Sequence, residues 1–307
     1  VSSEMITPIL PMLIIILGGN ALIIGLIGGL SDSITSILQV FSGHWSDRYG
    51  KRKPFIYSGY IISAISKLFL PLSTMWQHLL VIRPLERVGK GIRTAPRDAV
   101  IADSVVSEVR GKAFGFHRAF DTSGAILGSI LALILYWLLG LEFTPILWIS
   151  AIVAFLALPP IFFVREEARK QQRLTLKISL TALPKRLRLF VLIATIFALG
   201  NFTYMFFVTR AQEIFAQLFA EKMAKAIPIL LYVLFNIIYT LFSIPSGILS
   251  DKIGRKNVLL VGYLLFGVTC LGFALVPSLT SFLILFCLYG LVYALVDGTQ
   301  RAFASDL

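Results

Sequence analysis

Five ionisable side chains recur at steps of three and four residues in one stretch of an otherwise apolar sequence. They are Arg83, Glu86, Lys90, Arg93 and Arg97. This spacing places them on one face of a helix. A carboxylate beside cations can exchange a proton, and neighbouring cations can bind an anion. The stripe therefore indicates proton exchange, anion binding or a structural network of ion pairs.

Depth along the predicted helix, which covers residues 77–106, divides this charged stripe. The residues expected near the middle of the helix are Arg83, Glu86, Arg87 and Lys90. Those expected near its end, where they would pair with neighbouring loops, are Arg97, Asp98 and Asp103. For the middle group, a water-filled cavity and a buried ion network both remain open.

Other polar side chains interrupt apolar segments elsewhere in the chain. Asp32 lies halfway along residues 21–45. His117, Arg118 and Asp121 lie in residues 113–139, and the four-residue step from His117 to Asp121 puts both on one helical face. The remaining notable polar residues are Glu4, Asn201, Tyr204, Arg210, Asn236 and Asp297.

The composition is that of a membrane protein. Of 307 residues, 57% are hydrophobic and only 14% are charged, and the mean hydropathy is +0.85. Soluble domains are about a quarter charged, so an ordinary cytoplasmic enzyme is excluded. Disorder is excluded as well, because such an apolar chain cannot stay solvated.

Ten apolar spans follow one another, and a bilayer-crossing helix needs roughly 20 such residues. They cover residues 5–17, 21–45, 54–72, 77–106, 113–139, 143–163, 190–218, 226–249, 257–276 and 282–307. An ionised side chain at the bilayer centre costs about 2.5–3.5 kcal/mol. The charged stripe of residues 77–106 is therefore expected to face a wet cavity or ion partners, not lipid.

The basic residues explain the net charge of +12. They cluster after the second, fourth, sixth and eighth spans, whereas the alternate connections are nearly neutral apart from Lys222 and Lys225. Positive loops stay in the cytoplasm, so we expect a multi-pass protein with a cytoplasmic N-terminus. The charge then serves contact with the anionic inner leaflet, and no nucleic-acid partner is expected.

Cofactor and metal sites are not expected from the sequence. Cys270 and Cys287 both lie in apolar runs and suggest no disulfide framework. The three histidines, His44, His78 and His117, are too scattered for metal ligation. No nucleotide-binding loop occurs, which disfavours transport driven by ATP.

The chain contains an internal repeat. Gly43, Asp47 and Gly50 recur as Gly247, Asp251 and Gly254, each 204 residues later. We expect two halves of six spans each: an N-terminal bundle at 1–164, a cytoplasmic linker at 165–189, and an incomplete C-terminal bundle at 190–307. The second half then lacks its last two spans, so the chain is expected to be truncated.

The first copy of the repeat, Gly43-x-x-x-Asp47-Arg48-x-Gly50-Lys51-Arg52-Lys53, resembles motif A of the major facilitator superfamily. The resemblance implies an all-α membrane protein of two pseudo-symmetric six-helix bundles, with a central cavity and alternating access. It also implies a conformational latch at the motif, and small glycines would let helix backbones approach there. The latch residues are Gly43, Asp47, Arg48, Gly50, Lys51, Arg52, Gly247, Asp251, Gly254 and Arg255.

Residues 86–99 resemble a prokaryotic subgroup of the superfamily that is labelled as efflux permeases. Gly124-x-x-x-Gly128-Ser129 is similar to the family's antiporter motif, but Ser129 stands in place of its proline. That difference weakens the inference of export, because helix packing explains the two glycines equally well. The subgroup implies the cytoplasmic membrane of a prokaryote.

The expected function is secondary active transport of a small organic solute, coupled to protons, with efflux slightly favoured. Uptake of an anionic metabolite is the alternative. A sensor with a transporter fold and a membrane enzyme are remote alternatives, and no enzymatic activity is expected. We expect a monomer without cofactors.

The site residues divide into two roles. The candidates for proton coupling are Glu86, Asp121 and Asp32. The candidates for lining the substrate cavity are Arg83, Arg87, Lys90, Arg118, His117, Asn201, Tyr204 and Asn236.

Overall fold

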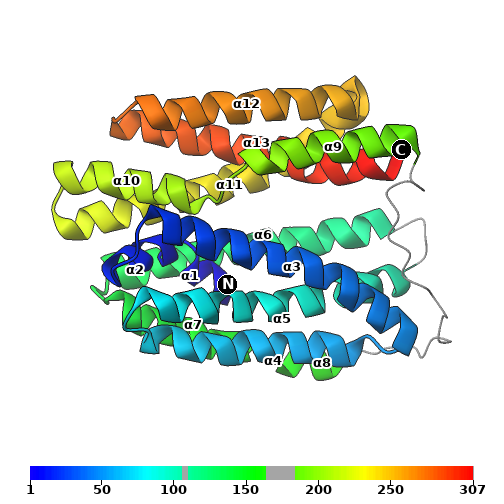
Figure 1. Cartoon of the computed structure of the whole chain (residues 1–307), viewed down its shortest axis with the longest axis horizontal. Coiled ribbons are helices and arrows are strands. Elements are labelled where there is room, and N and C mark those ends of the chain that lie inside the picture. Colours follow the sequence, from blue (N-terminus) through cyan, green and yellow to red (C-terminus); the bar gives the residue numbers. More distant parts are fainter. Residues whose placement is uncertain (106–109, 164–183, 307) are drawn as a thin grey trace. The chain divides into compact units, whose positions relative to one another are not determined.

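The computed structural model describes residues 1–105, 110–163 and 184–306, and all secondary structure in these ranges is helical (Figure 1). The chain divides into two compact units, Val1–Lys177 and Ile178–Leu307. The division falls inside the segment expected as a linker, of which residues 164–183 lie outside the described residues.

The helices of the first unit follow the spans expected from the sequence. They are α1 (Ser2–Ile6), α2 (Leu10–Ile16), α3 (Ala21–Tyr49), α4 (Lys53–Phe69), the 3-10 helix η1 (Leu70–Leu72), α5 (Trp76–Asp103), α6 (Arg110–Trp137), α7 (Phe143–Phe155) and α8 (Pro159–Phe163). The second unit contains α9 (Lys185–Gly200), α10 (Met205–Leu218), α11 (Glu221–Ile253), α12 (Arg255–Leu275) and α13 (Leu279–Asp306).

Eight helical segments of the described chain are long and apolar enough to cross a membrane. Helix α5 is not among them because it carries the charged stripe, and α1 and α2 are each too short. Each of the ten expected spans corresponds to one helix or to two consecutive helices. The prediction of an all-α membrane protein is confirmed.

Three spans expected as continuous are interrupted. The sixth span is split at residues 156–158, between α7 and α8. The first span is split between α1 and α2 around Pro8, which has no amide hydrogen to donate to a helix. The seventh span is split at residues 201–204, between α9 and α10. There Gly200 ends one helix, and Thr203 Oγ1 accepts a hydrogen bond from the amide of Met205, the first residue of α10, at 3.4 Å.

Helix α5 lies between α3 and α4 (Figure 1) and packs mainly against these two. Glycines allow the close approach. A Cβ atom on Gly59 of α4 would lie 2.6 Å from the carbonyl oxygen of Gly89 on α5. On the other side, a Cβ on Gly91 would lie 2.7 Å from Leu38 Cβ of α3. The backbone of α5 is thus held tightly, which fixes where its charged side chains point.

The second unit has an aromatic core. Phe207 of α10 stacks on Phe273 of α12, with ring centroids 4.2 Å apart, and meets Tyr289 of α13 edge-on at 4.7 Å. All three side chains are at most 3% exposed. The contact of α11 with α13 is close at Gly290, where a Cβ atom would lie 2.7 Å from the carbonyl oxygen of Phe235.

The contact between α4 and α5 gives a stability prediction. We expect Gly59→Ala to lower the free energy of unfolding by about 1–3 kcal/mol, because the new methyl group overpacks a closed crossing. Gly29→Ala is the matched control, since a Cβ there meets no described atom within 4 Å. Thermal unfolding of the detergent-solubilised protein measures both. Equal stability of the two variants would contradict the prediction.

Candidate functional site

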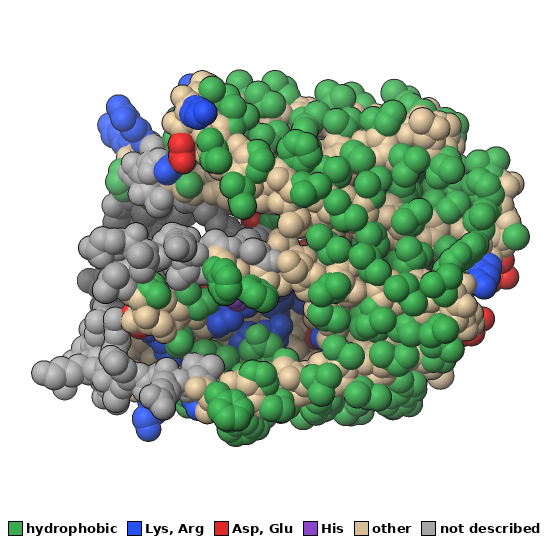
Figure 2. All heavy atoms as spheres, turned by 180° about the vertical axis from the view of Figure 1, so that it is seen from behind, with side chains coloured by type: hydrophobic (Ala, Val, Ile, Leu, Met, Phe, Trp, Pro, Cys, Tyr) green, Lys and Arg blue, Asp and Glu red, His purple; other side chains and the backbone are tan. Residues whose placement is uncertain are grey.

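Helix α5 turns its charged stripe toward the interior of the first unit. Arg83 and Glu86 are 0% and 3% exposed, whereas Val81 and Leu85 on the opposite face are 67% and 46% exposed. The outer face of α5 is therefore apolar, as lipid contact requires. Figure 2 shows one face of the molecule covered mainly by hydrophobic side chains.

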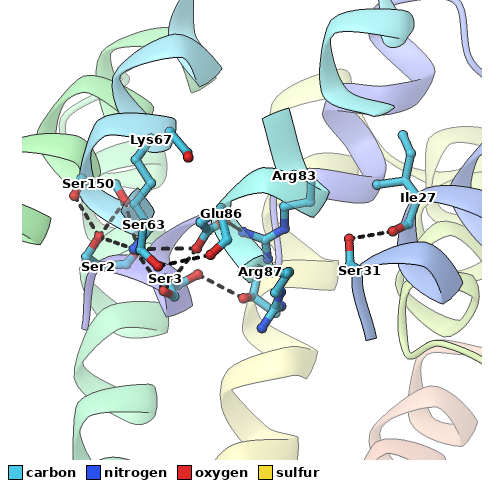
Figure 3. Close-up of polar contacts among 12 residues, drawn as sticks. Ser2, Ser3, Ile27, Ser31, Ser63, Lys67, Arg83, Glu86, Arg87 and Ser150 are labelled. Carbon is cyan, nitrogen blue, oxygen red and sulfur yellow. Dashed lines mark hydrogen bonds and ion pairs between the residues drawn. The ribbon is translucent and has the colours of Figure 1, made fainter. Parts of the chain in front are cut away.

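One part of the charged stripe is buried and forms ion pairs. Arg83 forms an ion pair with Glu86 one turn along α5, and Lys67 of α4 brings its Nζ to 3.6 Å from Glu86 Oε1. Figure 3 shows these three side chains pointing toward one another. Their side chains are at most 4% exposed. Removing such charges from water is costly, and the mutual attraction of the three charges offsets that cost.

Hydroxyl groups of α1 complete this arrangement (Figure 3). Lys67 Nζ donates to Ser2 Oγ at 2.9 Å and to Ser3 Oγ at 2.8 Å, and Ser3 Oγ donates to Glu86 Oε1 at 3.3 Å. Ser2 is in turn held by Ser150 of α7, since each hydroxyl donates to the other residue's carbonyl oxygen, at 2.7 and 2.8 Å. We call Ser2, Ser3, Lys67, Arg83 and Glu86 the buried ion cluster. It joins α1, α4 and α5 at one point.

Lys67 was missed by the sequence reasoning, which considered only the charges of α5 and the polar residues of other spans. The available signal was a lone lysine within the apolar span 54–72, in what is the last turn of α4. A cation at such a position needs a buried partner. The sequence alone does not say which carboxylate that partner is.

Arg93 faces α4. Its Nη1 donates to Ser63 Oγ at 2.6 Å, and its guanidinium lies 4.4 Å from the ring centroid of Tyr60, a cation–π contact. Ser63 Oγ donates to the backbone carbonyl of Glu86 at 2.9 Å. Arg93 is thus held by α4, next to the buried ion cluster.

The other part of the charged stripe is more accessible to solvent. Arg87 is half-buried and Lys90 is exposed, and within the described residues neither side chain forms an ion pair or a hydrogen bond. The carboxylates of Glu4 on α1 and Asp121 on α6 act electrostatically on Lys90. Glu4 is half-buried and Asp121 is exposed. We call Arg87, Lys90, Glu4 and Asp121 the open charged group.

The remaining first-unit candidates lie on α3 and α6. Asp32 is exposed on α3 and makes no ion pair within the described residues. His117 is half-buried on α6, one turn before Asp121. The side chain of Arg118 lies outside the described residues. The stripe thus contributes Arg87 and Lys90 to the same group as Asp121, but Arg83 and Glu86 to a separate, closed cluster.

Three candidates belong to the second unit. Asn201 and Tyr204 flank the interruption between α9 and α10, and both are half-buried. The side-chain oxygen of Asn201 is buried and accepts no hydrogen bond within the described part of the chain. Asn236 is buried on α11, where its Nδ2 donates to the carbonyl of Tyr232 at 2.9 Å, a bond within its own helix.

The first copy of the repeated motif ties three helix ends together. Gly50 ends α3 with φ +65°, a conformation that favours glycine. Arg52 Nη2 lies 2.9 Å from Asp47 Oδ1, and Arg52 also forms an ion pair with Asp103 at the end of α5. Burial lowers the pKa of Arg52, but the two carboxylates outweigh burial, so its pKa lies above the ordinary value. Arg48 and Lys51 are exposed beside it.

The second copy has the same layout with weaker contacts. Gly254 has φ +92°, and Arg255 Nη2 lies 3.8 Å from Asp251. Arg255 Nη1 donates to the carbonyl of Ala302 near the end of α13 at 2.6 Å. A Cβ on Gly43 would touch Ala95 Cβ at 3.3 Å, but one on Gly247 would meet no described atom within 4 Å. The backbone approach expected at Gly247 is therefore absent within the described residues.

Comparison with known proteins identifies the family. The model of the Major Facilitator Superfamily matches residues 1–307. The chain belongs to this superfamily. It is therefore a multi-pass membrane protein of a transporter family, in agreement with its apolar helices.

Individual relatives agree with this assignment. The chain is 52% identical over 307 residues to an uncharacterized MFS-type transporter of Methanocaldococcus jannaschii, covering 100% of this chain and 77% of that protein. It is 30% identical over 141 residues to the multidrug resistance protein MdtH of Photorhabdus laumondii, covering 46% of this chain and 34% of MdtH. Among solved structures, a mutant of the nucleoside transporter NupG matches with TM-score 0.76 and 16% identity, over 98% of this chain and 79% of that one.

The buried ion cluster gives a second stability prediction. Glu86→Gln leaves Lys67 and Arg83 facing each other without a compensating charge, so we expect it to lower the free energy of unfolding by about 3–5 kcal/mol. Adding Lys67→Met to Glu86→Gln should recover part of the loss, because one uncompensated cation is removed.

Asp98→Asn is the matched control for this series. Its carboxylate also pairs with an arginine, at 2.9 Å, but its side chain is 41% exposed, so its loss should cost little. Thermal and denaturant unfolding in detergent compare the variants. The assignment fails if Glu86→Gln is as stable as Asp98→Asn, or if Lys67→Met adds to the damage.

Proposed function

We propose that this transporter moves a small organic solute across the membrane by alternating access and couples that movement to protons. Two bundles, residues 1–164 and 190–307 connected by 165–189, would rock about the solute. The observation that carries the proposal is the open charged group. It combines exposed or half-buried carboxylates with cations on membrane helices. Ionised side chains are energetically costly in a membrane, so those present usually have a function.

Asp121 is the proton carrier that the geometry favours. Its side chain is exposed, and its carboxylate lies near enough to Lys90 to act on it electrostatically. Glu86 was an equal candidate from the sequence. It is instead held between Arg83 and Lys67, so protonating it would leave two buried cations opposed. We assign Glu86 to structure and retain Asp32 as the second carrier candidate.

Two directions of transport have support. Similarity to MdtH, whose name describes a multidrug resistance protein, favours efflux and covers 46% of this chain. Arg87 and Lys90, whose side chains form no ion pair within the described residues, favour uptake of an anionic solute. Efflux of amphiphilic compounds is the first candidate, and proton-coupled uptake of an anionic metabolite is the second.

The proposed setting is the cytoplasmic membrane, with a monomeric protein and a cytoplasmic N-terminus. Arg48 and Lys51 support it, since they are exposed at the end of α3 where the anionic inner leaflet would lie. Tryptic accessibility of the α3–α4 connection in sealed, right-side-out vesicles checks the orientation: the connection should be protected there and cleaved in inverted vesicles.

The proton role of Asp121 is tested with Asp121→Asn in proteoliposomes of the full-length protein. Ethidium and carboxyfluorescein serve as cationic and anionic transport probes under an imposed pH gradient. A variant that cannot exchange protons should lose gradient-driven accumulation by more than about tenfold while retaining solute exchange without a gradient.

Asp32→Asn is the control in the same assay, and it should retain most of the accumulation. The two probes separate the two candidate functions. Transport of ethidium, a drug-like cation, would support efflux of amphiphilic compounds, and transport of carboxyfluorescein, an organic anion, would support uptake of an anionic metabolite. Full accumulation by Asp121→Asn, together with its loss in Asp32→Asn, would transfer the proton role to Asp32.

A further inference from the structure

We propose that Arg87 and Lys90 form a binding site for the oxyanion group of an organic anion, such as a carboxylate, sulfate or phosphate. The inference rests on the proposed transporter function and deepens it by naming the chemical class of the solute. Three observations carry it: donors of Arg87 and Lys90 without a partner among the described residues, the local charge balance, and the exposure of Lys90.

The two cations are placed to act on one ligand. They are three residues apart on α5 and therefore neighbours on one helical face. The Nε of Arg87 is buried and has no hydrogen-bond acceptor within the described residues. A buried donor without an acceptor costs free energy, which an oxyanion would recover. The guanidinium fork of Arg87 matches two oxygens of such a group, and Lys90 adds a point charge.

The surrounding charges leave the site positive. Cations near it come from α4 and α5, and carboxylates come from α1, α5 and α6. The cations are Lys67, Arg83, Arg87, Lys90 and Arg93, and the carboxylates are Glu4, Glu86 and Asp121. The carboxylate of Glu86 is already paired with Arg83 and Lys67. Glu4 and Asp121 act on Lys90 but form no ion pair with it within 4.0 Å in the described chain.

Access distinguishes this pair from the rest of the stripe. Arg83 is 0% exposed and closed in by its neighbours, so no solute can reach it without breaking the buried ion cluster. Lys90, two turns further along α5, is exposed although it faces α1 and α6. A solute can therefore reach Lys90 first, with Arg87 behind it.

Cysteine labelling tests the site without a known solute. In a Cys270→Ser, Cys287→Ser background of the full-length protein, Lys90→Cys is treated with anionic and cationic methanethiosulfonates. The positive potential should make the anionic reagent react about ten times faster relative to the cationic one than at Thr74→Cys, an exposed control in the loop before α5. Adding Arg87→Gln should abolish that preference, whereas Arg87→Lys should keep it.

Three results would contradict the proposed anion site. A preference equal to that of Thr74→Cys, a preference unchanged by Arg87→Gln, or no reaction of the Lys90→Cys variant with either reagent overturns it. If Lys90→Cys does not fold, Thr94→Cys, one turn further along α5 and half-buried, takes its place. The labelling experiment does not measure transport, so it can be judged separately from the transport assay. If Asp121→Asn loses proton coupling but the anionic reagent is still preferred at Lys90→Cys, the anion site is supported. If coupling is intact but that preference is absent, the anion site alone is refuted.

Discussion

The charge of Glu86 is the constraint on which the first unit depends. A carboxylate that is 3% exposed inside a membrane protein must be matched, and Arg83 and Lys67 match it from two helices. That requirement brings α4 and α5 together, and the glycine contact between Gly59 and Gly89 makes the distance possible. The serines of α1 then satisfy the remaining donors of Lys67. The packing of α4 on α5, the glycines at their crossing and the serines of α1 thus all help to stabilise one buried charge.

The same helix also illustrates how neighbouring charges acquire different roles. Arg83 and Glu86 are closed off because α1 and α4 cover them, whereas Lys90 lies beyond that cover and meets water. Chemistry that needs exchange with solvent or solute is suited to the open positions. Rigid closure suits the covered ones, because breaking a buried ion pair is expensive. The two parts share a helix, so a solute bound at the proposed anion site would be held at a fixed distance from the buried ion cluster.

Much of this arrangement was readable from the sequence, and the rest depended on contacts that no local pattern encodes. The spacing of the stripe predicted one interior face of α5, and the repeat identified Gly50 and Gly254 as equivalent positions, both of which have positive φ. The division of the stripe into closed and open parts was not predictable. It depends on where α1 packs and on Lys67, whose partner is set by tertiary structure. The interruption at residues 201–204 was missed because apolar composition alone does not show a helix break.

The link between Ser2 and Ser150 has a consequence for how the protein is made. These residues are 148 positions apart, yet each accepts a hydrogen bond from the other. During synthesis α1 would enter the bilayer long before α7 exists. The buried ion cluster, which comes from α1, α4 and α5, can then form before α7, but Ser2 still lacks its partner Ser150. The attachment of α1 to the first unit is therefore completed only after α7 has been synthesised.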